Sequence, residues 1–225
     1  MTISKRVIQS MVVASSVVSL LISASALACG GDWYPEVQID PRIRGVAEAE
    51  KALAKGNYVA AAGSVVRMIP HIESLYRSRD PLLLRAERVL SVAIAREGGR
   101  LAIEREVPPE VLGHWSGKTS VDRTKNLSWS VDTLRRELVL QKDNPALMTD
   151  LGEALSKLDS GRDEARTILE SLAARDLIGS PQGYKALAEL RLQQGDEAGQ
   201  KLAMKRCQSM ASGSKVCESS VPRAS

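Results

Sequence analysis

Phenylalanine is absent from this chain of 225 residues, and aromatic residues as a whole make up only 3% of it. So few aromatic side chains argue against a nucleic-acid surface that stacks bases. The chain has only two histidines, which argues against a metal site built from imidazole ligands. Hydrophobic residues nevertheless make up 44% of the sequence, and Ala and Leu recur throughout. We therefore expect an aliphatic core of closely packed helices, with no metal and no cofactor.

The positive charges are dispersed. The formal net charge of +4 includes Lys5 and Arg6, and elsewhere the densest cationic runs are pairs such as Arg135-Arg136 and Lys205-Arg206. A nucleic-acid-binding protein normally gathers its cations on one face, whereas isolated pairs are typical of solvated helix surfaces. We expect no nucleic-acid partner.

Residues 1–28 have the three parts of a secretory signal peptide: a cationic start, an uncharged stretch and small residues before a cleavage point. Ser residues within the uncharged stretch make it a weak membrane span. The sequence Ala26-Leu27-Ala28-Cys29 resembles the lipobox of bacterial lipoproteins, although that family prefers Leu at position 26 and a small residue at position 27. We expect either a lipoprotein anchored through Cys29 or a soluble periplasmic or secreted protein, with residues 29–39 as a flexible segment.

The cysteine count bears on the same question. An exported chain with three cysteines has one left over if the other two form a disulfide. Cys207 and Cys217 are the natural pair, which leaves Cys29 free for a lipid. A bond between them would attach the C-terminal tail, residues 212–225, to the last helix, a structural role. A redox pair would more often have the spacing Cys-x-x-Cys.

Four dipeptides mark helix starts: Asp40-Pro41, Asp80-Pro81, Asn144-Pro145 and Ser180-Pro181. Asp, Asn and Ser side chains accept hydrogen bonds from unpaired N–H groups of the first turn, and Pro at the first helical position has no N–H to leave unpaired. A glycine that can end the helix follows each dipeptide by about four turns. These glycines are Gly56, Gly98, Gly161 and Gly195.

The spacing of apolar residues also predicts helices. In residues 126–142, between Tyr58 and Ser78, and after Pro81, apolar side chains recur every three or four positions and so form one stripe on a helix. No segment shows sustained alternation of the kind that predicts strands. The fold class we predict is all-α. The stripes comprise Leu127, Val131, Leu134 and Leu138; Ala62, Val65, Ile69 and Ile72; and Leu82, Ala86, Val89 and Ala93, widened by Leu90 and Ile94.

Three segments resemble the tetratricopeptide repeats (TPR), a family of helical hairpins. Residues 47–58, followed by Ala61 and Val65, look like a first helix, a Gly-Asn-Tyr turn and the small residue of a second helix. Residues 144–165 are similar again, and a third match runs from Tyr184 to Ala198. The resemblance implies an irregular array of antiparallel hairpins, a TPR-like α-solenoid, over residues 40–211. A Pro- and Gly-containing loop insertion occupies about 104–123, and we recognise no second helix in the second unit.

In such an array the first helix of each pair lines a concave surface, because the second helices pack on the outside. Carried over by position from the best-matching units, the resemblance implies a set of polar groove-facing residues. They are Thr149, Glu153, Ser156, Lys157, Lys185, Glu189 and Gln193.

The insertion contains the sequence Gly113-His114-Trp115-Ser116-Gly117-Lys118-Thr119. A phosphate-binding P-loop needs four residues between its glycines, and here there are three, with no strand predicted before them. His114 and Ser116 are a potential base and nucleophile but have no orienting acid nearby. We expect an exposed loop whose Trp115 packs onto the helical core.

Two further sets of residues call for an interpretation. His71 has no second His or Cys at the spacing of metal ligands, so we interpret it as a surface or boundary histidine on a helix. The acidic pairs Glu104/Glu106 and Glu153/Asp159 would serve glycan hydrolysis only if they faced each other across a cleft. We therefore expect no catalytic residues and no enzyme.

The sequence thus predicts an exported scaffold that binds a protein or peptide partner in the cell envelope. Two alternatives stay open. One is an envelope enzyme or glycan-binding protein that uses the insertion around His114 and Trp115. The other is a structural lipoprotein, attached through Cys29, within a larger envelope assembly.

Overall fold

The computed structural model divides the chain into two units, Met1–Ile39 and Asp40–Ser225. It describes residues 40–75, 79–105, 107–211 and 215–218, all of which belong to the second unit. The predicted signal peptide, Cys29 and the segment 29–39 lie outside the described residues, as does most of the tail 212–225.

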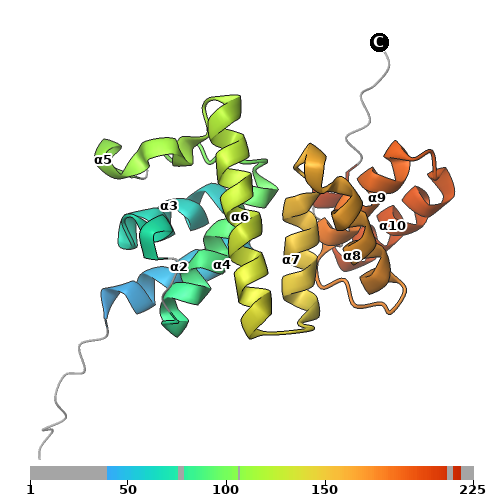
Figure 1. Cartoon of the computed structure of the whole chain (residues 1–225), viewed down its shortest axis with the longest axis horizontal. Coiled ribbons are helices and arrows are strands. Elements are labelled where there is room, and N and C mark those ends of the chain that lie inside the picture. The colour runs from blue at the N-terminus through green and yellow to red at the C-terminus, as the bar shows by residue number, and fades with distance from the viewer. Residues whose placement is uncertain (1–39, 76–78, 106, 212–214, 219–225) are drawn as a thin grey trace, which may run out of the picture. The chain divides into compact units, whose positions relative to one another are not determined.

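The described residues are all-α and contain no strand, as predicted (Figure 1). None of their helices is both long enough and apolar enough to cross a membrane. The α-helices are α2 (Pro41–Ala54), α3 (Tyr58–Met68), α4 (Pro81–Arg96), α5 (Pro109–Leu112), α6 (Ser120–Leu140), α7 (Pro145–Leu155), α8 (Arg162–Ala173), α9 (Pro181–Gln193) and α10 (Glu197–Met210). Short 3₁₀ turns are η1 (Ile72–Leu75), η2 (Gly113–Ser116), η3 (Asp159–Gly161) and η4 (Lys215–Cys217).

All four predicted helix starts are confirmed. Asp40, Asp80, Asn144 and Ser180 are the N-cap residues of α2, α4, α7 and α9, and each side chain accepts a hydrogen bond from a backbone N–H of the first turn. A proline follows each cap at the start of the helix. Local side-chain chemistry therefore fixes where these four helices begin.

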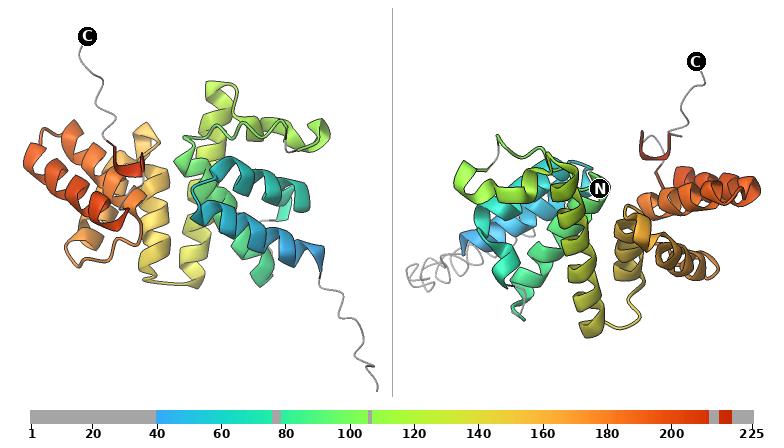
Figure 2. Two further views of the ribbon diagram at one scale, coloured as in Figure 1. Left: turned by 180° about the vertical axis from the view of Figure 1, so that it is seen from behind. Right: turned by 45° about the horizontal axis from the view of Figure 1, so that its top comes forward.

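The longer helices pack in pairs: α2 with α3, α4 with α6 across the insertion, α7 with α8, and α9 with α10 (Figures 1 and 2). The second helix of each of the first three pairs also packs against the first helix of the next pair. In addition, α2 packs against α4, α4 against α7, and α7 against α9. The partner of α4 is α6, so the second unit does have a second helix beyond the insertion, where we recognised none.

The aliphatic stripes form two core clusters. One joins α2, α3, α4 and the insertion, and includes Val65, Leu90 and Trp115; the other joins α6 to α10 and includes Leu134, Leu151 and Leu187. The predicted stripes of α4 and α6 are buried, apart from Leu82 and Leu138, which are half-buried. Burial of these side chains is the main force that holds the helices together.

The helix predicted between Tyr58 and Ser78 is shorter than expected. It ends at Met68, and Ile72 is buried from the separate turn η1. Pro70 explains the early end, because proline lacks an N–H and disfavours helical geometry in the residue before it. His71 therefore lies in a turn with φ 59° rather than on a helix, and it is exposed as expected.

The insertion contains two short helical turns, α5 and η2, where we expected none. Trp115 is 2% exposed and packs edge-on against Trp129, which confirms that it folds onto the core. The buried Asn126 of α6 fastens the insertion, since its Nδ2 is within hydrogen-bonding distance of the carbonyls of Gly99, His114 and Trp115.

Glycine allows two close helix crossings. A Cβ built on Gly152 of α7 would lie 2.7 Å from Cγ of the buried Leu169 in α8. A Cβ on Gly183 of α9 would lie 2.6 Å from Cγ2 of Thr149 in α7. Both distances are far inside normal contact, so a larger residue at either position would push two helices apart.

The predicted disulfide is present between Cys207 in α10 and Cys217 in η4. Both cysteines are buried, and η4 packs against α9 and α10. The bond therefore holds the turn η4 against the last helix pair.

Candidate binding groove

Two cavities that share Arg96 form what we call the groove, which lies between the first helices of the four pairs. The larger cavity has a volume of about 360 Å³ and is lined by α2, α4, α7 and the two residues before α9. The smaller has a volume of about 210 Å³ and is lined mainly by α4, α7 and α9. The larger is lined by Glu50, Leu53, Ala54, Arg85, Arg88, Val89, Val92, Arg96, Ala146, Thr149, Asp150, Gly179 and Ser180, and the smaller by Tyr58, Ala95, Arg96, Glu153, Lys157, Gln182, Lys185, Ala186, Glu189 and Val216.

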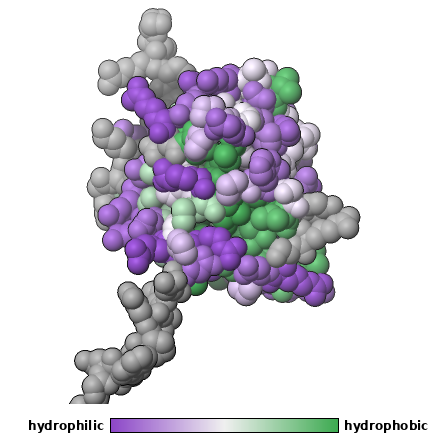
Figure 3. All heavy atoms as spheres, turned by 90° about the vertical axis from the view of Figure 1, so that its left-hand side faces the viewer, coloured by the Kyte–Doolittle hydropathy of each residue, from purple (hydrophilic) through white to green (hydrophobic). Residues whose placement is uncertain are grey.

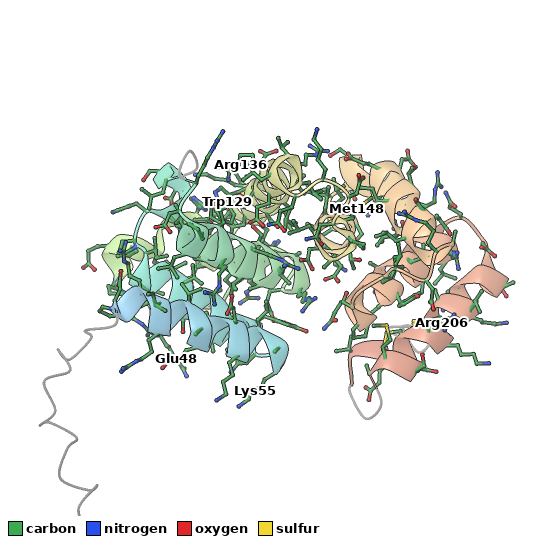
Figure 4. All side chains as sticks on the ribbon, turned by 90° about the horizontal axis from the view of Figure 1, so that it is seen from below. Glu48, Lys55, Trp129, Arg136, Met148 and Arg206 are labelled. Atoms are coloured by element: carbon green, nitrogen blue, oxygen red, sulfur yellow. A yellow bond between two sulfur atoms is a disulfide. The ribbon has the colours of Figure 1, made fainter. Side chains whose placement is uncertain are left out.

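Helical spacing explains why these side chains share one surface. On α4, Arg85, Arg88, Val92 and Arg96 recur at steps of three or four residues and so line a single face. Side chains of α7 and α9 line the groove with the same spacing. Seen from below, side chains of α2, α7 and α9 extend into the space between these helices, whereas the labelled Glu48 and Lys55 point away from it on α2 (Figure 4).

Ion pairs cross the groove from α4 to α7. The Arg88 guanidinium lies 2.8 Å from Oδ2 of Asp150, and Nε of Arg96 lies 3.0 Å from Oε2 of Glu153. The side chains of Arg96 and Glu153 are only 13% and 4% exposed. A buried pair of this kind fixes the geometry of the helices that carry it, because either charge alone would be strongly destabilising.

Glu153 and Arg96 have further partners that hold them in place. Glu153 accepts a hydrogen bond from the Ser180 hydroxyl, which links α7 to the start of α9. The Arg96 guanidinium lies 5.5 Å from the centre of the Tyr58 ring, a cation–π arrangement. The floor of the groove therefore connects α3, α4, α7 and α9 through polar contacts.

Burial and neighbouring charges perturb the acids of the groove. Burial raises the pKa of Asp150 to about 6, in spite of the opposing effect of Arg88. Near the rim, the hydrogen bond from Arg85 holds the pKa of Glu50 below its ordinary value. The larger cavity thus has one acid that titrates in a mildly acidic range and one that stays ionised there.

A second set of buried acids lies between α4 and α6, behind the groove. Glu87 and Glu137 are 2% and 3% exposed, and one carboxylate oxygen of each has no hydrogen-bond partner in the described structure. Burial raises the pKa of both, that of Glu137 to about 7. We call Glu87, Ser91, Ser130, Thr133 and Glu137 the polar seam, because all five are buried where α4 and α6 pack.

Five of the seven residues predicted to face a groove line one of these cavities. Thr149 lines the larger cavity, and Glu153, Lys157, Lys185 and Glu189 line the smaller.

The other two predicted residues do not line either cavity. Ser156 donates a hydrogen bond to the Glu153 carbonyl, and Gln193 is exposed at the end of α9. The sequence reasoning also missed the residues contributed by α2, α3 and α4, and four on α7 and α9: Ala146, Asp150, Gln182 and Ala186. The charges Arg85, Arg88 and Arg96, spaced like helix turns on α4, were the signal that could have indicated them.

The acids and bases weighed for catalysis have other partners. Nδ1 of His114 lies 2.7 Å from Oδ1 of the buried Asn126, Glu104 pairs with Lys118, and Asp159 pairs with Arg162. Glu106 lies outside the described residues. Within the described ranges no group of three or more His, Cys, Asp or Glu residues is arranged to hold a metal ion.

The chain matches no family model, no curated protein and no solved structure.

Proposed function

We propose that this protein is an exported, non-catalytic scaffold of the cell envelope that binds a segment of a partner protein in the groove. The observation that carries the proposal is the lining of the groove. The lining combines apolar side chains such as Leu53 and Val92 with paired charges such as Arg96 and Glu153. The two cavities have volumes of about 360 and 210 Å³. Concave surfaces with a few well-placed polar groups are typical of binding sites.

The order of the helices supports a TPR-like α-solenoid. Each second helix of the first three pairs packs against the next first helix, and the first helices α2, α4, α7 and α9 pack in succession. Those four helices supply every lining residue of the two cavities except Tyr58 at the start of α3, residues 179–180 before α9, Lys157 just beyond α7, and Val216 of η4. Repeat arrays use such concave surfaces for recognition.

The cellular location rests on the sequence alone. The signal-like residues 1–28 and the cysteine at 29 favour export, either with a lipid on Cys29 or after simple cleavage. The buried Cys207–Cys217 disulfide agrees with an oxidising compartment. A lipid on Cys29 would make the groove a tethered docking site at a membrane surface.

The test is affinity capture of the tagged protein, expressed with its native N-terminus, from crosslinked envelope extracts. The groove variant carries Lys157→Gln, Lys185→Gln and Glu189→Gln. The control variant carries Glu197→Gln, Lys201→Gln and Lys205→Gln, which change the same residue types on the exposed face of α10.

We expect the wild type and the control variant to recover the same partner and the groove variant to lose it, with unchanged circular dichroism for all three. Loss of the partner from both variants, or from neither, would contradict binding in the groove.

A further inference from the structure

One cation in the groove has no counter-charge among the residues that the structure describes. Arg85, Arg88, Arg96 and Lys157 pair with Glu50, Asp150, Glu153 and Glu189, at 2.6, 2.8, 3.0 and 3.4 Å. The fifth cation is Lys185, which lines the smaller cavity and makes no ion pair or hydrogen bond with any residue that the structure describes.

The geometry of α9 shows why Lys185 stays unpaired. Glu189 lies one turn further along α9, a spacing at which a lysine and a glutamate can pair. Glu189 instead reaches across to Lys157, just beyond the end of α7, at 3.4 Å. The contact between α7 and α9 therefore uses the carboxylate that would otherwise neutralise Lys185, and the half-buried ammonium group faces the cavity alone.

Other hydrogen-bond donors line the same cavity. Tyr58 accepts a hydrogen bond from Nε2 of Gln182 at 2.7 Å, so its own hydroxyl hydrogen is free to donate. Nε and Nη2 of Arg96 donate hydrogen bonds to the Glu153 carboxylate. The two hydrogens on Nη1 of Arg96 have no acceptor among the described residues. Both side chains line the smaller cavity with Lys185, so this cavity combines an excess positive charge with donors that lack acceptors.

The volume and walls of the cavity fit one acidic side chain. At about 30 Å³ for each water molecule, a cavity of about 210 Å³ holds roughly seven waters, more than a carboxylate needs. Ala95, Ala186 and Val216 line it as well and provide apolar contact for methylene groups. Charge-assisted hydrogen bonds from ammonium, guanidinium and phenol groups are the strong type for a carboxylate.

We propose that the smaller cavity binds an Asp or Glu side chain of the partner segment, with Lys185 as its counter-charge and Tyr58 and Arg96 as additional donors. The proposal rests on the proposed function, because it names the partner chemistry for the same groove. It makes the groove selective for acidic segments and makes binding sensitive to salt.

Titration calorimetry at low ionic strength tests this with three probes: the peptide acetyl-Gly-Glu-Gly-Glu-Gly-Glu-amide, the same peptide with Gln for Glu, and glutarate. We expect the Glu peptide to bind and the Gln peptide to bind roughly tenfold more weakly or not at all. Glutarate represents a free dicarboxylate. Binding of glutarate as tight as that of the Glu peptide would overturn a protein segment as the occupant.

Two pairs of matched variants locate the site. Lys185→Gln should weaken the Glu peptide roughly tenfold, whereas Lys201→Gln, which removes the same charge from the exposed face of α10, should leave its affinity within about twofold. Glu189→Gln frees Lys157 and should tighten binding, whereas Glu197→Gln on α10 should not. Equal effects within either pair would overturn the assignment to this cavity.

The result is separable from the test of the proposed function. A partner that is captured by the wild type and lost with the groove variant, without any binding of the Glu peptide, would overturn the acidic ligand and leave the scaffold function standing. No capture of a partner and no binding of the Glu peptide would overturn both.

Discussion

Replacing Glu137 with Gln should change how the stability of the protein depends on pH. Glu137 is buried in the polar seam, and burial is the main cause of its raised pKa of about 7. Among its neighbours, Arg88 and Arg136 lower the pKa, whereas Glu87 and Asp150 raise it. These groups come from α4, α6 and α7, so charges on three helices act on Glu137.

The sign follows from proton linkage. Between the ordinary pKa of 4.5 and the folded value of about 7, the folded chain keeps a proton on Glu137 that the unfolded chain releases. Stability therefore falls as pH rises through this range, and the full cost is present above pH 7. The difference between the two pKa values corresponds to about 3 kcal/mol of unfolding free energy. About 2 kcal/mol of it should develop between pH 5 and pH 8, because part of the cost is already present at pH 5.

Glutamine cannot ionise, so Glu137→Gln removes this cost. We expect the variant to gain about 2 kcal/mol relative to the wild type on going from pH 5 to pH 8, measured by urea unfolding followed by circular dichroism. Glu48→Gln is the control, because Glu48 is exposed and points away from the helices packed against α2 (Figure 4). A difference between variant and wild type that is the same at both pH values would refute the reasoning.

Three further predictions concern the scaffold of the groove. Replacing Cys207 and Cys217 together with Ser should lower the unfolding free energy by about 3 kcal/mol and increase amide hydrogen exchange in η4, whereas unchanged stability would contradict a structural role for the bond. Asn126→Ala leaves buried carbonyls without donors and should lower the unfolding free energy by about 2 kcal/mol. It should also change the near-ultraviolet circular dichroism signal from Trp115. An unaltered signal would contradict the role of Asn126 in fastening the insertion. Gly152→Ala should lower the unfolding free energy by about 1 kcal/mol or more, because the buried Leu169 cannot move aside. Gly179→Ala is the control and should be close to neutral, because its Cβ would have no neighbour closer than 3.9 Å. Equal melting temperatures of the two variants would contradict the close crossing of α7 and α8.

Features set by neighbours in the chain were predictable from the sequence. The four helix starts depend on a cap residue and the proline that follows it, and the apolar stripe of α6 depends on spacing within one helix. Trp115 was expected to fold onto the core because a large aromatic side chain in a small loop gains much from burial. The end of α3 was missed because the apolar spacing outweighed Pro70 in the prediction.

Features set by packing between distant segments could be predicted only in part. The family resemblance pointed to Thr149 and Glu153 on α7 and to Lys185 and Glu189 on α9 but not to their neighbours Asp150 and Gln182. Arg85, Arg88 and Arg96 on α4 look like any solvated charges until α7 is placed beside them. Burial of Glu137 is of the same kind, since a glutamate on a helix is normally exposed.

Exposed apolar side chains also lie on the side of α2, α3 and α5. Figure 3 shows hydrophobic residues among hydrophilic ones on this face. Ile43 at the start of α2 and Leu75 in η1 are 45% and 42% exposed. Single exposed apolar side chains of this kind are normal on a protein surface.

Site-specific photo-crosslinking in cells tests the central claim most directly. A photoreactive amino acid is placed at position 182, in the smaller cavity, and separately at position 201, on the exposed face of α10. We predict that ultraviolet light gives one discrete crosslinked partner from position 182 and none from position 201. Crosslinking of the same partner from position 201 only, or of no partner from position 182, would contradict a groove that binds a partner segment.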